Sequence, residues 1–489
     1  MSRRDQEAKT TIEVQATKVA RAEADQASGS HDQLVDENKA TGSHSQLIEE
    51  SQKLSILIHE KPRSTCSWQD RLNSLKLGPE NENPASRIQK VPFMLRENKE
   101  FEKYYKPKMV AIGPIHHRDP NFEFTEKRKH IVAGDFIKEH GIDAENLYDK
   151  IMDGLGNLKM RYVEDVIKDY TDDELAWMFL VDGCAILHFI HCVVNDEKND
   201  PQYSAKLEKF NFKKNQVAYA QQDLFLFENQ LPYQLLELLI SSVVQNKERE
   251  DIRESIRNFI DMNLMTPEST TKSRQGRRKP SKSHLLELLW EELTDGILPQ
   301  SGGLTMHSFR NVKELMTSGI QLKASSENSL NISFNQFCFT GTLQIPSLVV
   351  DDSTAAKFLN LIAYEMCPDF MNDFQVTSYI CFLDSLIDHP EDVQELRKAK
   401  ILINVLGSDN EVAELFNKIG NDLVPNPDIY GTVKDNIEKY YNSKWTTYSA
   451  EAYHSYFSSP WTFLAFLGAL LGLFFSAVQA YFSLPSKSC

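Results

Sequence analysis

The stretch "DLFLFENQLPYQLLELL", Asp223–Leu239, places three polar residues between two strongly apolar runs. Glu228, Asn229 and Gln230 come just before Pro232, which suits the first turn of a helix because that turn needs no N–H from it. The free amides at a helix start need acceptors, and Asn229 or Gln230 can supply a side-chain oxygen. We interpret these four residues as a structural motif, a hydrogen-bonded corner between two packed apolar helices.

A catalytic interpretation of the same corner is the alternative. A carboxylate such as Glu228 can act as an acid or base if it faces a cleft and burial tunes its pKa. The loop "IGPIHHRDP" adds the imidazoles of His116 and His117. However, the sequence contains no phosphate-binding glycine loop, no nucleophile elbow and no His-Glu-x-x-His helix. We therefore predict a protein that is not an enzyme and binds no cofactor, and keep an enzyme cleft near Glu228, His116 and His117 as the alternative.

The best candidate for a metal site is "DGCAILHFIHC", in which Cys184, His188 and His191 share one helical face. Thiolate and imidazole groups are good zinc ligands, but a fourth ligand is missing from the local sequence. The neighbouring residues are apolar. The stretch therefore predicts a buried helix with core histidines and no metal site.

Helical periodicity dominates residues 86–445. In "DDSTAAKFLNLIAYEM" apolar residues recur at spacings of three and four, which predicts an amphipathic helix. Further on, Pro390 suits a helix start and Gly407 its end. Ser408 then begins a capping box, and Gly420 ends the helix that follows it.

One segment of this region alternates as a strand does. "ISFNQFCFTGTLQIPSLVV" alternates around Gly341 and predicts a short hairpin with a slip in register near Asn335. The predicted fold class is therefore mainly α: a large helical domain with a small β-hairpin insert. The segment "SRQGRRKPSK" contains five basic residues and no acid, and we assign it to a loop at 268–283. This basic loop separates two candidate halves, 88–267 and 284–445.

The amino-terminal part of the chain differs in composition. Residues 1–85 are rich in polar residues and contain one aromatic residue, Trp68, so they cannot bury enough apolar area to offset ordering entropy. We predict a disordered tail, in which "GSHDQLVDE" and "GSHSQLIEE" form a short tandem repeat. The formal net charge of −16 argues against nucleic-acid binding. Seven scattered cysteines indicate a reducing compartment.

The other end predicts a membrane helix. Residues 461–482 contain no charged residue and would span ~33 Å as a helix, close to the thickness of the hydrocarbon core. Residues 446–460 are then juxtamembrane and 483–489 a short tail. Because lysines are more frequent before the span than after it, we place the bulk of the chain in the cytosol, as a single-pass protein of an unknown membrane.

Small residues follow one face of this predicted membrane helix. Gly468, Gly472 and Ser476 are spaced four residues apart, which allows two helix backbones to approach closely. The spacing favours lateral association with a second copy, giving a homo-oligomer, or with another membrane protein.

Several segments together resemble one family, the plant proteins that carry "domain of unknown function 247". They include "VPFMLRENKEFEKYYKPKMVAIGPIHH", "EKRKH", "MFLVDGC", the opening "DLFLFENQLPYQLLELL", "LQIPSLVVDDST", "NLIAYE", "LGSDNEVAELFN" and the terminal "SPWTFLAFLGALL". The resemblance covers residues 86–485. It implies a mostly helical plant protein with a carboxy-terminal membrane anchor and no established enzymatic activity. Some grass members of the family are linked to pollen self-incompatibility.

The predicted function follows from the anchor and from the missing catalytic signatures. We expect a membrane-anchored, non-enzymatic interaction or recognition protein, with a role in pollen self-incompatibility as the narrower version. The alternatives are the enzyme cleft described above and a nuclear regulator that uses the basic loop. Protein partners are expected, but the sequence does not identify them.

Overall fold

The computed structural model describes residues 86–442, apart from 199, 211, 268–282, 298, 300–309, 326–328, 338–339 and 371, together with 460–483. The predicted disordered tail with its tandem repeat, the basic run at 273–282 and residues 446–459 lie outside this part. Within it the chain is mainly helical, as the periodicity predicts, and contains five short strands.

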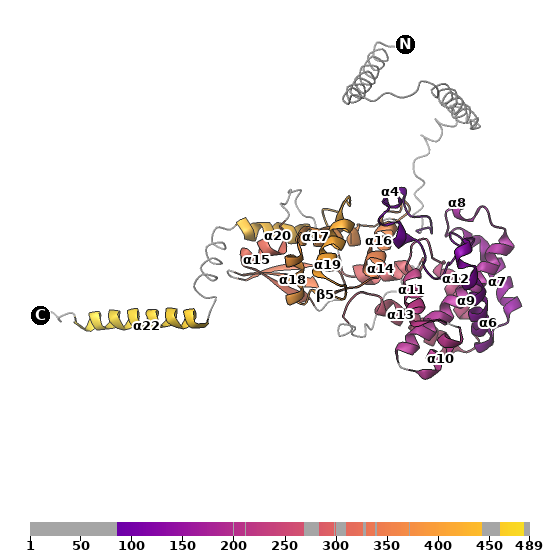
Figure 1. Cartoon of the computed structure of the whole chain (residues 1–489), viewed down its shortest axis with the longest axis horizontal. Coiled ribbons are helices and arrows are strands. Elements are labelled where there is room, and N and C mark those ends of the chain that lie inside the picture. Colours follow the sequence, from indigo (N-terminus) through magenta and orange to yellow (C-terminus); the bar gives the residue numbers. More distant parts are fainter. Residues whose placement is uncertain are drawn as a thin grey trace, which may run out of the picture. The chain divides into compact units, whose positions relative to one another are not determined.

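The first half of the described domain is built around one long helix, α9 (Asp172–Glu197). Thr171 caps its start in a capping box with Glu174. Helices α6, α7, α10, α12 and α13 all pack on α9 (Figure 1). The helices of this half are α4 (Phe93–Arg96), α5 (Glu102–Tyr105), α6 (Glu123–Glu139), α7 (Ala144–Lys159), α8 (Glu164–Ile167), α10 (Pro201–Lys209), α11 (Lys214–Asp223), α12 (Tyr233–Ser242) and α13 (Asn246–Met262), with the 3₁₀ turn η1 (Pro120–Phe122).

The described part of the second half adds seven helices and two small sheets. Its helices are α14 (Leu285–Thr294), α15 (Val312–Thr317), α16 (Thr354–Glu365), α17 (Gln375–Leu386), α18 (Pro390–Lys398), α19 (Asp409–Gly420) and α20 (Gly431–Asn442). Ser408 caps α19 and accepts a hydrogen bond from the amide of Glu411, and Gly420 ends that helix, as predicted. The predicted end of α18 at Gly407 is wrong. The helix ends at Lys398, because Lys400 takes a left-handed conformation (φ 59°) and a strand follows.

The predicted hairpin is present, but its details differ. Strands β2 (Ser333–Phe337) and β3 (Thr340–Pro346) pair antiparallel in one continuous register, so the predicted slip near Asn335 is wrong. Gly341 lies within β3 and not in the turn. A Cβ there would come within 2.7 Å of the Phe334 ring, so cross-strand packing requires the glycine.

Two parallel pairings were not predicted from the sequence. Strand β1 (Ile320–Ser325) pairs parallel with β3, which gives a three-stranded sheet of order β1-β3-β2. Strands β4 (Leu348–Val350) and β5 (Leu402–Asn404) form a separate parallel pair.

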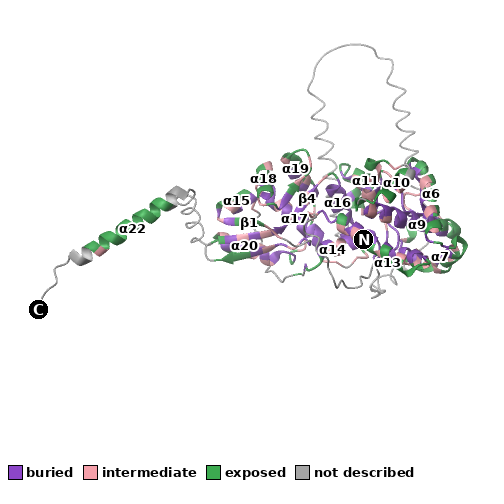
Figure 2. Cartoon of the chain, turned by 90° about the horizontal axis from the view of Figure 1, so that it is seen from below, coloured by how far each residue is buried: buried purple, intermediate pink, exposed green. Residues whose placement is uncertain are grey.

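One hydrophobic core connects the two halves. Its buried side chains run from Ile88 to Tyr440 and include residues of both halves (Figure 2). Asn360 of α16 donates to the Tyr104 carbonyl and accepts from the Phe227 amide, at 2.9 and 2.8 Å. The candidate halves therefore share buried polar contacts as well as a core.

Two helices bear on the predicted membrane span. By length and composition α9 could cross a membrane, but its side chains form the core of the domain. The carboxy-terminal helix α22 (Pro460–Ser483) confirms that residues 461–482 are helical. Its described side chains, Leu464–Gln479, form a shorter apolar stretch that is almost entirely exposed (Figure 2). Whether α22 crosses a membrane stays a prediction, as does packing through Gly468, Gly472 and Ser476.

Candidate functional site

The corner formed by Glu228, Asn229, Gln230 and Pro232 lies against an irregular segment, residues 108–118, that we call the strap. The strap pairs with no described strand, so its buried amides need other acceptors. Asp223, the last residue of α11, supplies both of its carboxylate oxygens as acceptors. Its carboxylate accepts from the amides of Lys108, Met109 and Val110 at 2.9, 2.6 and 2.9 Å. Burial raises the pKa of Asp223 to about 6, and the three N–H groups oppose that shift.

Asn229 and Gln230 continue this pattern, with both ends of each amide in use. Asn229 accepts from the Ile112 amide at 2.6 Å and donates to the carbonyls of Val110 and Asp223. Gln230 accepts from the Leu286 amide in the first turn of α14 and donates to two carbonyls of its own loop. Each oxygen therefore serves an amide of another segment, and not the start of α12 as the sequence suggested. Pro232 precedes α12 as its N-cap.

Glu228 is buried and has two partners. One carboxylate oxygen accepts from the Val91 amide at 2.7 Å, and the other lies 3.1 Å from Nε2 of His116. His117 points elsewhere, with Nδ1 3.7 Å from a carboxylate oxygen of Glu126. The structure thus brings Glu228 and His116 together and leaves His117 in a second cluster.

That second cluster centres on Lys129, whose side chain is only 5% exposed. Its ammonium group lies 2.5 Å from Asp182 and 2.6 Å from Glu126, and donates to the Ala111 carbonyl at 2.7 Å. Asp182 uses its other oxygen to accept from the Gly113 amide at 2.8 Å. Burial raises the pKa of Glu126. The cluster therefore fixes the strap to both α6 and α9.

Glycine is required where the strap passes the corner. Gly113 has a φ of +69°, and a Cβ there would lie 2.9 Å from the Gln230 carbonyl oxygen. The Tyr162 hydroxyl donates to that same carbonyl at 3.1 Å. Both the conformation and the close approach of the two backbones therefore exclude a larger residue.

Sequence reasoning missed Asp223, Lys129 and Asp182, although each lies in a segment that carries the family resemblance. They belong to "DLFLFENQLPYQLLELL", "EKRKH" and "MFLVDGC" in turn. A charged residue inside an apolar run, as Asp182 is within α9, was the available signal, because such a charge must find a partner. Chemically, the network supplies hydrogen-bond partners to the buried backbone amides and carbonyls of the strap.

The three candidate metal ligands do not assemble. Among the residues that the structure describes, no group of three or more His, Cys, Asp or Glu side chains could hold a metal ion. Burial raises the pKa of the Cys184 thiol to about 12. His188 packs between the rings of Phe136 and Phe210, whereas His191 is hydrogen-bonded to Ser255 and Tyr203.

The burial of His188 predicts a loss of stability in acid. Burial lowers the pKa of His188 from 6.5 to about 4, so the unfolded chain takes up a proton before the folded protein does. Above pH 6.5 the ring is neutral in both the folded and the unfolded protein, and its burial costs no stability. As the pH falls from 6.5 toward 4, the unfolded chain binds a proton that folding must release, and the free energy of unfolding decreases. At pH 5 the loss amounts to about 2 kcal/mol. We expect His188→Phe to remove this loss when unfolding of the full chain by urea is measured at pH 7 and pH 5.

His130, an exposed histidine of α6, provides the matched control. His130→Phe should leave the difference between the two pH values unchanged. An unchanged difference in His188→Phe would show that His188 is not the group that titrates.

Comparison with known proteins gives a match across most of the chain. A family model described as a plant protein of unknown function matches residues 88–475. An UPF0481 protein from Arabidopsis thaliana is 28% identical over 414 residues, covering 77% of this chain and 82% of that protein. A putative UPF0481 protein from the same plant is 27% identical over 174 residues, covering 35% and 32%. No solved structure matches. The matched region contains the strap, the corner and the Lys129 cluster.

Proposed function

Since this chain belongs to the plant family that carries domain of unknown function 247, we propose that it is a membrane-anchored interaction protein without enzymatic activity. In this proposal α22 is the anchor and the bulk of the chain lies in the cytosol. The helical domain presents a fixed surface to protein partners.

The observation that carries the proposal is the exposed apolar surface of α22. Leu473, Phe474 and Phe475 are 69, 62 and 64% exposed, and the described part of the helix carries no charge. An apolar surface of this extent needs a membrane or another protein to cover it. Twenty-four helical residues extend ~36 Å, enough to cross the hydrocarbon core of a bilayer.

Membrane extraction tests the anchor. The full chain, tagged at its amino terminus, should stay in the membrane pellet after alkaline carbonate treatment. Leu471→Arg combined with Leu473→Arg should release most of it, because each arginine near the middle of a span costs roughly 2.5–3.5 kcal/mol.

The matched control replaces the same two leucines by alanine, which shortens the side chains without adding charge. This variant should remain in the pellet. A full chain that extracts into the soluble fraction, or an arginine variant that stays in the pellet, would remove the anchor from the proposal.

A role in pollen self-recognition is the narrower version of this function. It rests on the family resemblance alone. Pollen-restricted expression with strongly divergent alleles would support it, and uniform expression with little allelic variation would count against it.

The enzymatic alternative has one supporting observation, the 3.1 Å contact between His116 and Glu228. The second carboxylate oxygen of Glu228 is occupied by the Val91 amide. The side chains of His116 and Glu228 are only 15 and 10% exposed. Because acid or base catalysis needs access to a substrate, this geometry favours the structural role. The nuclear alternative depends on the basic loop, which lies outside the described residues apart from Ser283.

A further inference from the structure

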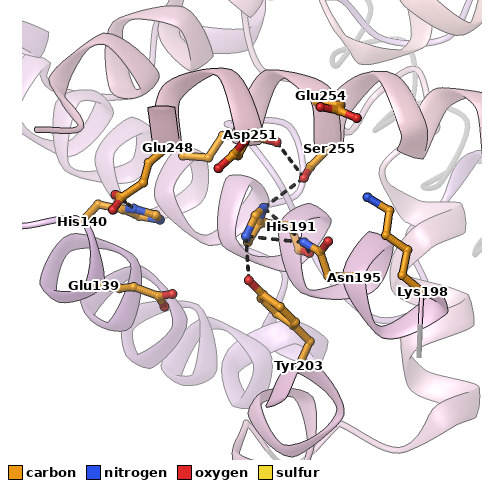
Figure 3. Close-up of a pocket in the computed structure, with 11 residues that line it drawn as sticks. Glu139, His140, His191, Asn195, Lys198, Tyr203, Glu248, Asp251, Glu254 and Ser255 are labelled. Carbon is orange, nitrogen blue, oxygen red and sulfur yellow. Dashed lines mark hydrogen bonds and ion pairs between the residues drawn. The ribbon is translucent and has the colours of Figure 1, made fainter. Parts of the chain in front are cut away.

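A polar pocket of about 350 Å³ lies between α6, the end of α9, α10 and α13 (Figure 3), and no residue of the strap lines it. Its size lies within the range of small-molecule sites. It is lined by Glu139, His140, His191, Asn195, Lys198, Tyr203, Glu248, Asp251, Ile252, Glu254 and Ser255. Neither the strap network nor the proposed anchoring uses these side chains.

The centre of the pocket is a hydrogen-bond chain through His191 (Figure 3). Ser255 donates to the Asp251 carbonyl at 2.9 Å, so its oxygen accepts from Nδ1 of His191, also at 2.9 Å. The remaining nitrogen, Nε2, then accepts from the Tyr203 hydroxyl at 3.1 Å. Burial lowers the pKa of His191, in agreement with a neutral ring. This wall of the pocket is therefore fixed and uncharged.

His140 presents an unused acceptor to the same pocket. The residue is 7% exposed, and its Nδ1 lies 2.7 Å from the Glu248 carboxylate. The other nitrogen, Nε2, points into the pocket (Figure 3) and has no hydrogen-bond partner among the described residues. With the proton on Nδ1, shared with Glu248, Nε2 offers a lone pair to a ligand that carries an N–H donor.

The charge of the lining also selects a cation. Four carboxylates line the pocket, those of Glu139, Glu248, Asp251 and Glu254. Against these four carboxylates the lining contains one lysine, Lys198. Lys206 is not part of the lining and is paired with Glu139 at 2.7 Å. The carboxy-terminal end of α9, the negative end of its dipole, reaches the pocket as well. No described residue pairs with the carboxylates of Asp251 and Glu254.

The carboxylates follow one another along α13. From Glu248 to Glu254 the helix rises ~9 Å, so negative charge extends along the pocket and is not gathered at a point. Such a row fits a linear molecule with two or more separated positive charges better than it fits a single ion.

We propose that this pocket binds a small aliphatic polyamine. One ammonium group donates to Nε2 of His140 beside Glu248, and a second lies between Asp251 and Glu254.

Calorimetric titration of the full chain in detergent with spermidine, at 150 mM salt, tests the proposal. We expect one site per chain. Asp251→Asn, a change at an exposed position, should weaken binding about tenfold, because it removes a charge-assisted contact. Spermidine whose nitrogens are fully methylated keeps its charge but has no N–H donor, and should also bind about tenfold more weakly.

Glu250→Gln is the matched control. Glu250 lies on the same helix and pairs with Arg253, outside the pocket lining. This change should alter the affinity less than about twofold, the effect expected of an exposed charge. The absence of binding heat would overturn the proposal, and so would an equal loss in Glu250→Gln and Asp251→Asn, which would indicate a diffuse counterion effect.

Discussion

Lys129→Met should lower the free energy of unfolding by about 3–5 kcal/mol, the cost of leaving a buried charge without its partner. Asp182 is 1% exposed, and in this variant the Gly113 amide is the one described partner left to its carboxylate. Glu126 loses its nearest cation and the Ala111 carbonyl loses its donor. The measurement is urea unfolding of the full chain in detergent at pH 7.

Two further variants separate charge burial from the loss of a lysine as such. Lys127→Met changes an exposed lysine of the same helix, which is paired with the exposed Glu123, and should alter stability by less than about 0.5 kcal/mol. Adding Asp182→Asn to Lys129→Met should recover part of the loss, since the amide oxygen still accepts from Gly113 without a buried charge. If the double variant were as unstable as the sum of the two single ones, the charge argument would fail.

Local signals account for what the sequence predicted correctly about the fold. Apolar periodicity indicated the helices, and Ser408 marked a helix start that the structure confirms. The strands joined over long distances carry no such signal. Pairing of β4 with β5 connects residues about 50 positions apart, with α16, α17 and α18 between them. The end of α18 was placed too late, at Gly407, because the left-handed residue that follows the helix is Lys400 and not a glycine.

The candidate site shows the same division between local and distant information. A polar corner could be located from Glu228, Asn229 and Gln230, because they interrupt an apolar run. Of their partners, only His116 was named from the sequence, as part of the alternative cleft with Glu228. The others could not be located, since Val91, Ile112 and Leu286 are distant in sequence and offer only backbone amides. Backbone partners leave no trace in side-chain identity, so a pattern of residues cannot reveal them.

Asn229→Ala should destabilise the domain by about 3–5 kcal/mol. At this position, which is 1% exposed, the variant leaves the Ile112 amide and the Val110 carbonyl without a partner. It also leaves the Asp223 carbonyl with the Leu226 amide as its remaining donor. Each buried group left unpaired costs about 1–3 kcal/mol, and partial relaxation of the strap keeps the total below the largest sum. We expect reduced abundance in cells and a lower urea midpoint for the full chain.

Asn410→Ala is the control for this prediction, because Asn410 is exposed and its side-chain amide donates to Glu414 one turn along the same helix. It should leave the urea midpoint unchanged within about 0.5 kcal/mol of unfolding free energy. An Asn229→Ala protein of normal stability and abundance that nevertheless lost its partners or its biological role would support the catalytic or binding interpretation of the corner. Loss of stability together with abundance would instead tie the corner to the strap, because the Ile112 amide and the Val110 carbonyl have no other described partner.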